Sequence, residues 1–320
     1  MTQRGPYKTK PIPGSFADLI MKFRQSPRYR AWAPSTRLVK DRILDNFRLA
    51  NGKTMVEDMR RGDVIAMRDS MADMPEAANN WLKTIRVLLD YAVDLEMVTL
   101  NVARARVARL SSPNPDGFRT WREDEIAAYL AHWPLGSLPH TVLTLALYTG
   151  AARVDLVRLG WQNVEGDIGI PISGRIRYRR QKVKGGPWID ILILPPLAKV
   201  LALIPDRQMT FLETRDGRVR SDKGLTGDMG RWVKAAGLGA SDEHGKGLTL
   251  HGLRKALGRR LAEAGVAPHG IMAILGHEDI KQAQTYTKAY DRARSADDAM
   301  ERMGAIWAAP TKVTKLRRKE

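Results

Sequence analysis

One short segment does most to limit how this chain can fold. Residues 111–117 read Ser-Ser-Pro-Asn-Pro-Asp-Gly, and two prolines, a glycine and four small polar residues do not continue a helix or a strand. Directly after them, Thr120 and Glu123 form the Thr-x-x-Glu pattern of a capping box, which predicts the start of a new helix. The chain is therefore expected to form two domains joined by a linker over residues 111–118.

The part before the linker shows only helical spacing. Its clearest helix follows Pro75, because proline is favoured at the first helical position. The apolar residues of this helix recur every three or four positions and define one face: Trp81, Leu82, Ile85, Leu88, Leu89 and Ala92. Residues 14–110 are expected to form a helical domain, and residues 1–13, with three prolines, a flexible arm before it.

The part after the linker changes its periodicity along the chain. Helical spacing runs to about Leu159 and returns from Asp228. Between them lie three stretches with strand-like patterns: an alternation at Ile168, Ile170 and Ile172, a weaker one over 175–183, and an apolar run over 189–194. Lys184-Gly185-Gly186 supplies a turn between the last two. The predicted fold class is mainly α with a small antiparallel β-sheet, and the sheet belongs to this second domain.

The charge of the chain indicates its class of partner. Lys and Arg total 53 against 35 Asp and Glu, so the formal net charge is +18. Such a surface attracts polyanions, of which nucleic acid comes first and an anionic membrane second. The chain has no cysteine, which excludes thiol nucleophiles and disulfides. No signal-like segment and no run near about 18 apolar residues appears, so we expect a cytoplasmic protein without membrane contact.

Two segments offer cationic groups that suit a phosphate. In Thr149-Gly150-Ala151-Ala152-Arg153, a helix ends at the Thr-Gly break and Arg153 opens the next helix, where its planar donors can meet a phosphate. A surface salt bridge between Arg153 and Asp155 is the alternative. The second segment, residues 175–184, has six basic residues and no acid on an expected hairpin. It can reach DNA phosphates or be a solvated basic strand.

Two further segments offer groups that exchange protons. His251 and Arg254 lie three residues apart, which places them on one helix face. Leu275-Gly276-His277 follows the pattern of a glycine-capped helix end, and Tyr286 is expected on the helix after it. A zinc site of the His-Glu-x-x-His type is excluded, because Lys281 occupies the place of the second histidine. Each segment alone is also compatible with a purely structural role.

Together and in this order, the four segments resemble the tyrosine recombinase, or phage integrase, family. The matching text is Thr149–Arg153, Gln181-Lys182, His251–Arg254, Leu275–His277 and Thr285–Lys288. The resemblance covers nearly the whole chain. It implies a helical core-binding domain over residues 14–110, which binds DNA, a catalytic domain over 119–300, and a basic C-terminal tail over 301–320. It also implies an enzyme that cuts and rejoins DNA through a 3′-phosphotyrosyl intermediate, without metal or nucleotide cofactor.

The resemblance assigns a role to each matching residue. Tyr286 is the implied nucleophile, Lys182 the acid that protonates the leaving 5′ oxygen, and His251 the general acid or base. Arg153 and Arg254 are the implied phosphate clamp, and His277 a second hydrogen-bond partner of the phosphate. Lys184 fits the place of Lys182 almost as well, and Tyr290 is a rival to Tyr286 one helical turn later. The family often has a carboxylate three residues after the first arginine, whereas here Leu156 holds that place and Asp155 precedes it.

The resemblance further implies partners and biological roles. The expected partner is double-stranded DNA, bound by a homotetramer on paired recombination sites, with accessory DNA-bending factors a further expectation. The reaction would integrate or excise a phage or mobile element. Alternatives that share the residues are a recombinase that resolves chromosome or plasmid dimers and a type IB topoisomerase. A DNA-binding protein that has lost catalysis is the other class considered.

Overall fold

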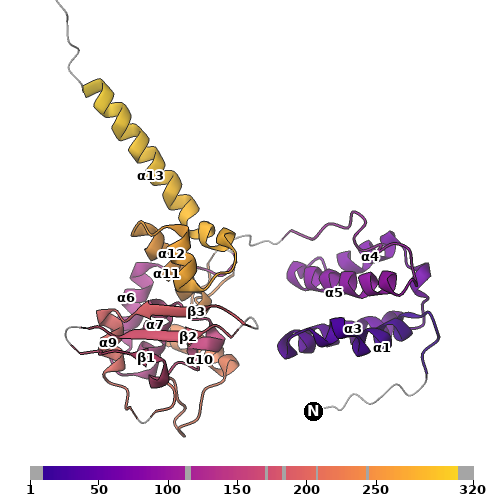
Figure 1. Cartoon of the computed structure of the whole chain (residues 1–320), viewed down its shortest axis with the longest axis horizontal. Helices are drawn as coiled ribbons and strands as arrows, with labels where there is room; N and C mark the ends of the chain where they lie inside the picture. The colour runs from indigo at the N-terminus through magenta and orange to yellow at the C-terminus, as the bar shows by residue number, and fades with distance from the viewer. Residues whose placement is uncertain are drawn as a thin grey trace, which may run out of the picture. The chain divides into compact units, whose positions relative to one another are not determined.

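The computed structural model describes residues 10–111, 117–169, 172–181, 185–206, 208–242 and 245–308, and for 288–295, 298–299 and 305–308 it describes the backbone alone. The chain divides into two compact units, Met1–Pro115 and Asp116–Glu320, which Figure 1 shows with their helices and strands. The predicted class is confirmed, since the fold is mainly helical with one three-stranded antiparallel sheet in the described residues. None of the described helices is long and apolar enough to cross a membrane.

The described residues of the first unit form helices and no β-strand, apart from an isolated bridge between Ser15 and Met55. Its elements are α1 (Phe16–Gln25), α2 (Pro27–Arg30), α3 (Pro34–Asn51), the 3-10 turn η1 (Val56–Asp58), α4 (Arg61–Asp69) and α5 (Pro75–Asp94). Proline begins both α3 and α5, as its missing N–H allows at a helix start. The face predicted for α5 is buried against α1 and α3, where Phe16, Leu19 and Leu44 complete the core.

The segment after α5 is held against that helix by side-chain hydrogen bonds. The Asn79 amide donates to the Leu110 carbonyl at 2.8 Å, and its carbonyl oxygen accepts the Leu110 N–H at 2.9 Å. The Arg86 guanidinium donates to the Ala103 carbonyl at 2.9 Å. These contacts satisfy backbone groups that a loop without regular structure leaves open. Residues up to Leu110 therefore belong to the first unit, while residues 112–116 of the expected linker lie outside the described part.

The second unit places its sheet between two helical stretches of the chain. Its elements are α6 (Glu123–His132), α7 (Leu138–Thr149), α8 (Arg153–Leu156), η2 (Trp161–Asn163), β1 (Val164–Glu165), β2 (Arg175–Arg179), β3 (Trp188–Leu192), α9 (Pro195–Leu201), α10 (Asp222–Ala235), α11 (Leu250–Glu263), α12 (Pro268–Leu275) and α13 (Ile280–Ala308). The strands pair antiparallel in the order β1-β2-β3, with Ile176 opposite Ile191 and Tyr178 opposite Ile189. These four side chains are buried on one face of the sheet.

Two predictions about this unit are wrong. The strand expected at Ile168, Ile170 and Ile172 is not formed at the described residues 168, 169 and 172, because Gly166 takes a φ of +84° and the Asp167 carbonyl accepts N–H bonds from Ser173 and Gly174. The strand in its place is the shorter β1. Ile170 lies outside the described residues. The capping box expected at Thr120 is not formed, since α6 begins at Glu123 and the Glu125 carboxylate accepts the Arg122 N–H at 2.9 Å. Helix α9 had no counterpart in the sequence prediction.

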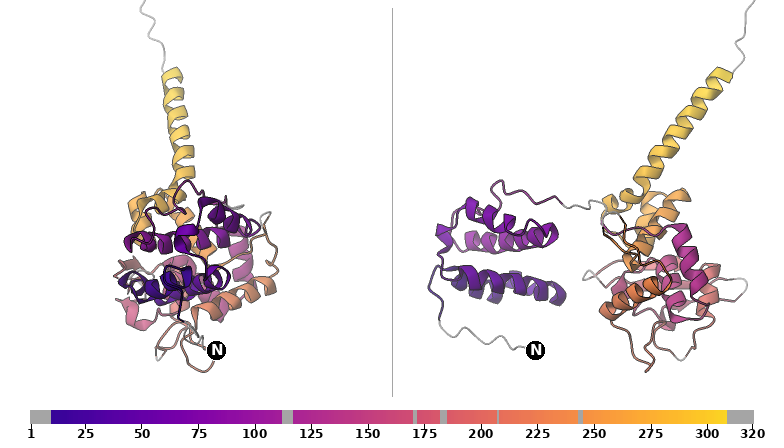
Figure 2. Two further views of the ribbon diagram at one scale, coloured as in Figure 1. Left: turned by 90° about the vertical axis from the view of Figure 1, so that its right-hand side faces the viewer. Right: turned by 180° about the vertical axis from the view of Figure 1, so that it is seen from behind.

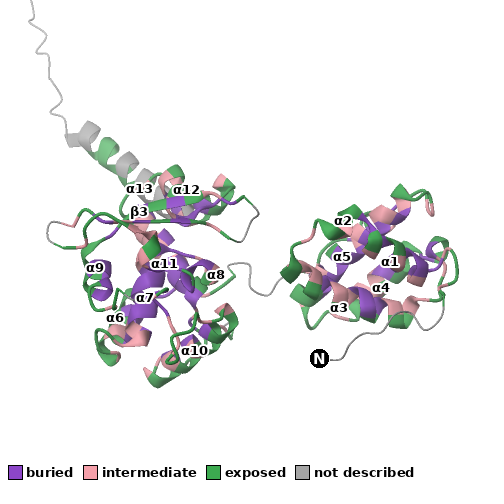
Figure 3. Cartoon of the chain, turned by 60° about the horizontal axis from the view of Figure 1, so that its bottom comes forward, coloured by how far each residue is buried: buried purple, intermediate pink, exposed green. Residues whose placement is uncertain are grey.

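Helix α11 lies at the centre of the second unit. It packs against α7, α12 and α13, so that residues from distant parts of the sequence meet along it. Figure 3 shows α7 and α11 largely buried, which agrees with the nearly continuous apolar sequence of α7. Figures 1 and 2 show that α13 starts beside α12 and then extends away from the rest of this unit. The start of α13 is therefore the part of that helix that meets α11 and α12.

The core of the first unit predicts a measurable difference between two leucines of neighbouring helices. Leu82 is fully buried on α5, whereas Leu49 of α3 is 78% exposed. Leu82→Ala should lower the free energy of unfolding by about 2–5 kcal/mol, because it removes buried apolar atoms and leaves a cavity. Leu49→Ala should change it by less than about 0.5 kcal/mol. Equal effects of the two substitutions in chemical denaturation would contradict this core.

Candidate active site

Two left-handed helix ends meet beside α11. Gly150 ends α7 with a φ of +59°, and Gly276 ends α12 with a φ of +61°, a backbone conformation that glycine adopts without steric cost. The ends also pack closely, since a Cβ added to Gly150 would lie 2.6 Å from a methyl carbon of Leu275. This packing brings the last carbonyl groups of both helices to one place.

Arg254 of α11 lies between these two helix ends. Its Nη1 donates to the Gly150 carbonyl and its Nη2 to the Leu275 carbonyl, and its side chain is buried. The carbonyls at a helix C-terminus carry partial negative charge, which suits a cation. No carboxylate of the described residues forms an ion pair with Arg254. Burial and, to a smaller extent, the charge of nearby Arg180 lower its pKa to about 10, so the group stays cationic at neutral pH.

His277 follows Gly276 directly and is 8% exposed. Its ring stacks on that of Tyr286, with centroids 6.0 Å apart and planes at 9°. The buried Nδ1 atom has no hydrogen-bond partner in the described residues. Burial, followed by the charges of Arg254, Arg180 and His251 in that order of size, lowers the pKa of His277 to about 4. The imidazole is therefore neutral at physiological pH and has one nitrogen open for a hydrogen bond.

Tyr286 lies in the second turn of α13 and approaches α11 at a glycine. A Cβ added to Gly258 would lie 2.8–2.9 Å from three carbons of the Tyr286 ring, so only glycine permits this approach without displacement. Burial raises the pKa of the Tyr286 phenol, while the charge of Arg254 lowers it in part. Tyr286 is thus held against both His277 and the backbone of α11. The side chain of its rival Tyr290 lies outside the described residues.

The residues after β2 are hydrogen-bonded to the end of α12 and to α8. The Arg180 guanidinium donates through Nη1 to the Gly276 carbonyl, and the Gln181 N–H donates to Asp155 Oδ1 at 2.9 Å. Asp155 is buried on α8, and burial raises the pKa of its carboxyl group. The hairpin end is therefore fixed to α8 on one side and to the α12 end on the other. Lys182 and Lys184 come next in the chain, and both lie outside the described residues.

The remaining two predicted site residues differ in their surroundings. His251 is exposed on α11, its ring lies 4.6 Å from that of Phe118, and it is close enough to His277 to lower the pKa of that residue. Arg153 turns to α10 instead. Its Nη1 donates to Thr226 Oγ1 at 2.8 Å, and its Nη2 forms an ion pair with Asp222 at 2.9 Å. The structure thus brings together Arg254, His277 and Tyr286, with His251 within electrostatic reach and Arg153 bonded to α10.

Sequence reasoning missed two residues of this cluster. Arg180 was only one of six basic residues on the predicted hairpin, and no local pattern separates it from the others. Asp155 was considered as a surface partner of Arg153, but it is buried and accepts the Gln181 N–H instead. The apolar neighbours Val154 and Leu156 gave a weak signal that Asp155 is buried on a helix.

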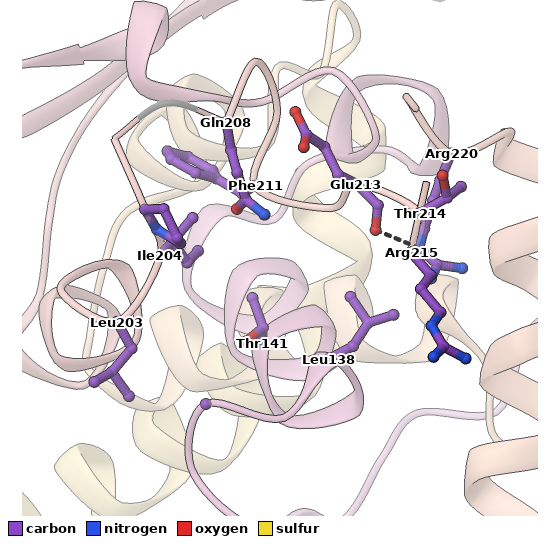
Figure 4. Close-up of a pocket in the computed structure, with 12 residues that line it drawn as sticks. Leu138, Thr141, Leu203, Ile204, Gln208, Phe211, Glu213, Thr214, Arg215 and Arg220 are labelled. Carbon is purple, nitrogen blue, oxygen red and sulfur yellow. Dashed lines mark hydrogen bonds between the residues drawn. The ribbon is translucent and has the colours of Figure 1, made fainter. Parts of the chain in front are cut away.

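A cavity of about 330 Å³ lies elsewhere in the second unit. Figure 4 shows its lining, which comes from α7 and from residues 203–220, with Leu138, Phe211 and Arg220 among them. None of the predicted site residues lines it. Among the described residues no group of three or more His, Asp or Glu side chains could hold a metal ion.

Comparison with known proteins gives a family and a fold. The phage integrase family matches residues 122–293, more than half of the chain. A lambda integrase dimer bound to a COC′ core site has a TM-score of 0.70 at 20% identity, over 84% of this chain and 94% of that one. A lambda integrase tetramer bound to a Holliday junction has a TM-score of 0.69 at 20% identity, over 85% and 77%.

A third similar structure comes from a different mobile element. The Tn1549 transposon integrase in complex with a circular intermediate DNA has a TM-score of 0.69 at 16% identity, over 88% of this chain and 99% of that one. No curated protein matches the chain in sequence. The fold, with its gathered tyrosine, histidine and arginine, is that of a tyrosine-type site-specific recombinase. The chain belongs to the phage integrase family.

The contact between Gly258 and Tyr286 predicts that replacing this glycine by alanine destabilises the protein, which is the reverse of the usual result in a helix. Gly→Ala within a helix normally stabilises a protein by about 0.5–1 kcal/mol. Gly230 of α10 has open space around it, so Gly230→Ala should show this gain in the free energy of unfolding. Gly258→Ala should instead lower it by about 1–3 kcal/mol, because the Tyr286 ring must move. If both variants gain stability in chemical denaturation, the close approach of Tyr286 to α11 is wrong.

The surroundings of His277 predict an unusual titration. Its folded pKa of about 4 lies below its ordinary value, so the unfolded chain binds the proton first as the pH falls. The stability that His277 contributes is therefore complete above about pH 6.5 and declines towards pH 4. In an NMR titration from pH 8 to 5, its imidazole signals, assigned with His277→Gln, should remain those of a neutral ring. A midpoint near 6.5 would contradict the buried, partnerless imidazole.

Proposed function

We propose that this recombinase cuts and rejoins double-stranded DNA with Tyr286 as nucleophile, through a 3′-phosphotyrosyl intermediate. The observation that carries the proposal is the stack of the Tyr286 ring on buried His277, beside the buried cation Arg254. Arg254 lies on α11, Tyr286 on α13, and His277 in the segment between α12 and α13, so these three residues come from separate parts of the sequence. The biological reaction we propose is integration or excision of a phage or other mobile element.

The chemistry needs a positive site, because a phenol attacks a phosphodiester that already carries a negative charge. As the Tyr286 oxygen bonds to phosphorus, the bond from phosphorus to the 5′ oxygen breaks and charge accumulates on the non-bridging oxygens. Arg254 is held rigidly by two carbonyl groups and can stabilise that charge without reorganising. The new phosphotyrosyl bond conserves the energy of the broken one, so rejoining needs no nucleotide.

We assign the two histidines different roles on the basis of their burial. His277 is buried and neutral, with Nδ1 open, and we propose that it hydrogen-bonds a non-bridging phosphate oxygen. His251 is exposed on the face of α11 that also carries Arg254. We propose it as the general base that takes the phenol proton and returns it during rejoining. A phosphate beside His277 would raise the pKa of that histidine, because an anion favours the charged form.

The leaving group requires an acid, for which we propose Lys182. The residue before it, Gln181, is anchored through its backbone to buried Asp155. Lys182 therefore follows a fixed point of the hairpin directly, whereas Lys184 is two residues further along. Fewer backbone torsions separate Lys182 than Lys184 from this anchored residue, and we propose Lys182 on that ground.

The high positive charge supports DNA as the partner, because neutralised phosphates release counterions. We propose that residues 14–110 form the core-binding domain and 119–300 the catalytic domain, as the sequence suggested. The similar lambda integrase was solved as a tetramer bound to a Holliday junction, and we propose the same assembly here. Accessory DNA-bending factors belong to this proposal as well.

The nucleophile is tested by a pair of tyrosine variants. The wild-type protein should become covalently attached to members of a library of nicked duplexes with randomised sequence, because the nick lets the cleaved 5′ fragment diffuse away. Tyr286→Phe should abolish the adduct and leave DNA binding unchanged, since only the attacking oxygen is lost. Tyr290→Phe is the matched control and should retain the adduct.

Three outcomes would contradict the proposal. An adduct that survives Tyr286→Phe but not Tyr290→Phe would identify Tyr290, and not Tyr286, as the nucleophile. Relaxation of supercoiled plasmid without any preferred duplex in the library would indicate a topoisomerase instead of a site-specific recombinase. Binding to the library without any adduct would indicate a DNA-binding protein that has lost catalysis.

A further inference from the structure

Three buried polar atoms around Arg254 lack a hydrogen-bond partner in the described residues. They are Oδ2 of Asp155, Nε of Arg180 and Nδ1 of His277. A buried polar atom without a partner costs free energy, so such atoms usually have a ligand or an ordered water in the working state. Two of the three can donate a hydrogen bond, and both lie against Gly276 at the end of α12. The site is therefore prepared for an acceptor.

The charges around the site favour an anion as that acceptor. The charge of Arg180 lowers the pKa of Arg254, and the charges of both lower the pKa of His277. Within the described part of the chain, neither guanidinium forms an ion pair with a carboxylate, and both donate to helix-end carbonyls instead. Asp155 offers the nearest negative charge, and its Oδ1 already accepts the Gln181 N–H. Two guanidinium groups thus lie at the end of α12 without an ion pair to a described carboxylate.

Among the described residues, Arg153, unlike Arg180 and Arg254, forms an ion pair with a carboxylate. Its guanidinium is compensated by the Asp222 carboxylate at 2.9 Å and bonded to Thr226 at 2.8 Å, both on α10. To contact a phosphate beside Tyr286, it would have to break both contacts. Arg180 needs no such step, because its Cδ already packs on Gly276, next to His277.

We propose that Arg180 is a catalytic residue of the proposed recombination reaction, the second guanidinium that contacts the scissile phosphate opposite Arg254, in the place that the sequence resemblance gives to Arg153. The inference rests on the proposed function of Tyr286. Arg180 keeps its Nη1 bond to Gly276 and donates from its remaining N–H groups, including Nε, to a non-bridging oxygen. Gln181 and Lys182 follow it, so one hairpin end supplies both the charge and the proposed acid.

The proposal is tested by the rate of adduct formation on a duplex selected from the nicked library. In single turnover at saturating DNA, Arg180→Ala should slow the adduct by about 10²–10³-fold, as expected for a lost transition-state donor. Arg153→Ala should slow it by less than about tenfold, because its charge is already compensated. Arg177→Ala is the matched control, since Arg177 lies on the exposed face of the same strand. Arg180→Lys keeps the charge without the planar fork and should be intermediate.

A second substrate separates contact with the phosphate from a structural role of Arg180. In a methylphosphonate duplex, the scissile group lacks the negative charge that a guanidinium would neutralise. The defect of Arg180→Ala, relative to wild type, should therefore shrink on this substrate by at least about tenfold. A defect of equal size on both substrates would mean that Arg180 only supports the turn at Gly276, and would overturn the proposal. So would equal rates of Arg180→Ala and Arg177→Ala.

A measurement without cleavage keeps this inference separate from the proposed function. Inorganic phosphate is titrated into the full-length protein, and the NMR signals of the His277 ring report binding. Arg180→Ala should weaken phosphate binding by at least about tenfold, whereas Arg153→Ala should leave it within about twofold. If the wild-type protein forms no adduct but Arg180→Ala still weakens phosphate binding more than Arg153→Ala does, the proposed function is wrong, while the phosphate site at Arg180 is supported. If phosphate binds equally to Arg180→Ala and wild type, the inference on Arg180 is wrong.

Discussion

The buried guanidinium of Arg254 organises the second unit. It joins the C-terminal ends of α7 and α12 by donating to the Gly150 and Leu275 carbonyls. Both helices can end there only because glycine accepts a left-handed conformation at 150 and 276. A cation buried between two helix ends is satisfied by partial charges alone, which leaves its full charge for an anion. The same contact that closes the core thus prepares the site.

The position of every other site residue follows from this arrangement. Gly276 ends α12 so that His277 turns inward, and the start of α13 then places Tyr286 on that imidazole and against Gly258. The sheet contributes through Arg180 and Gln181, which attach the end of β2 to α12 and α8. Burial raises the pKa of Tyr286 and lowers that of His277, so both side chains are neutral at physiological pH. Arg254 stays charged at neutral pH, since its pKa is about 10.

Sequence reasoning predicted what depends on local periodicity and on motif order. The face of α5, the β2–β3 pairing and the helix ends at Gly150 and Gly276 were all foreseen. The strand predicted at Ile168, Ile170 and Ile172 is not formed at the described residues 168, 169 and 172, because the turn at Gly166 and Asp167 overrides the alternation. The order of the sequence motifs predicted that Arg254, His277 and Tyr286 lie close together. It did not predict the hydrogen bonds of Arg153 and Arg180. Arg180 meets Gly276, 96 residues later, and such a contact leaves no local pattern in the sequence.

The central claim is that a phosphorus atom of DNA becomes bonded to the phenol oxygen of Tyr286. Peptide mapping of the covalent complex of the unaltered protein tests this most directly. Trypsin cleaves after Lys281, Lys288 and Arg292, so residues 282–288 and 289–292 fall in separate peptides, each with a single tyrosine. The account predicts a nucleotide-bearing peptide Gln-Ala-Gln-Thr-Tyr-Thr-Lys, linked through Tyr286. A nucleotide on any other peptide would contradict it.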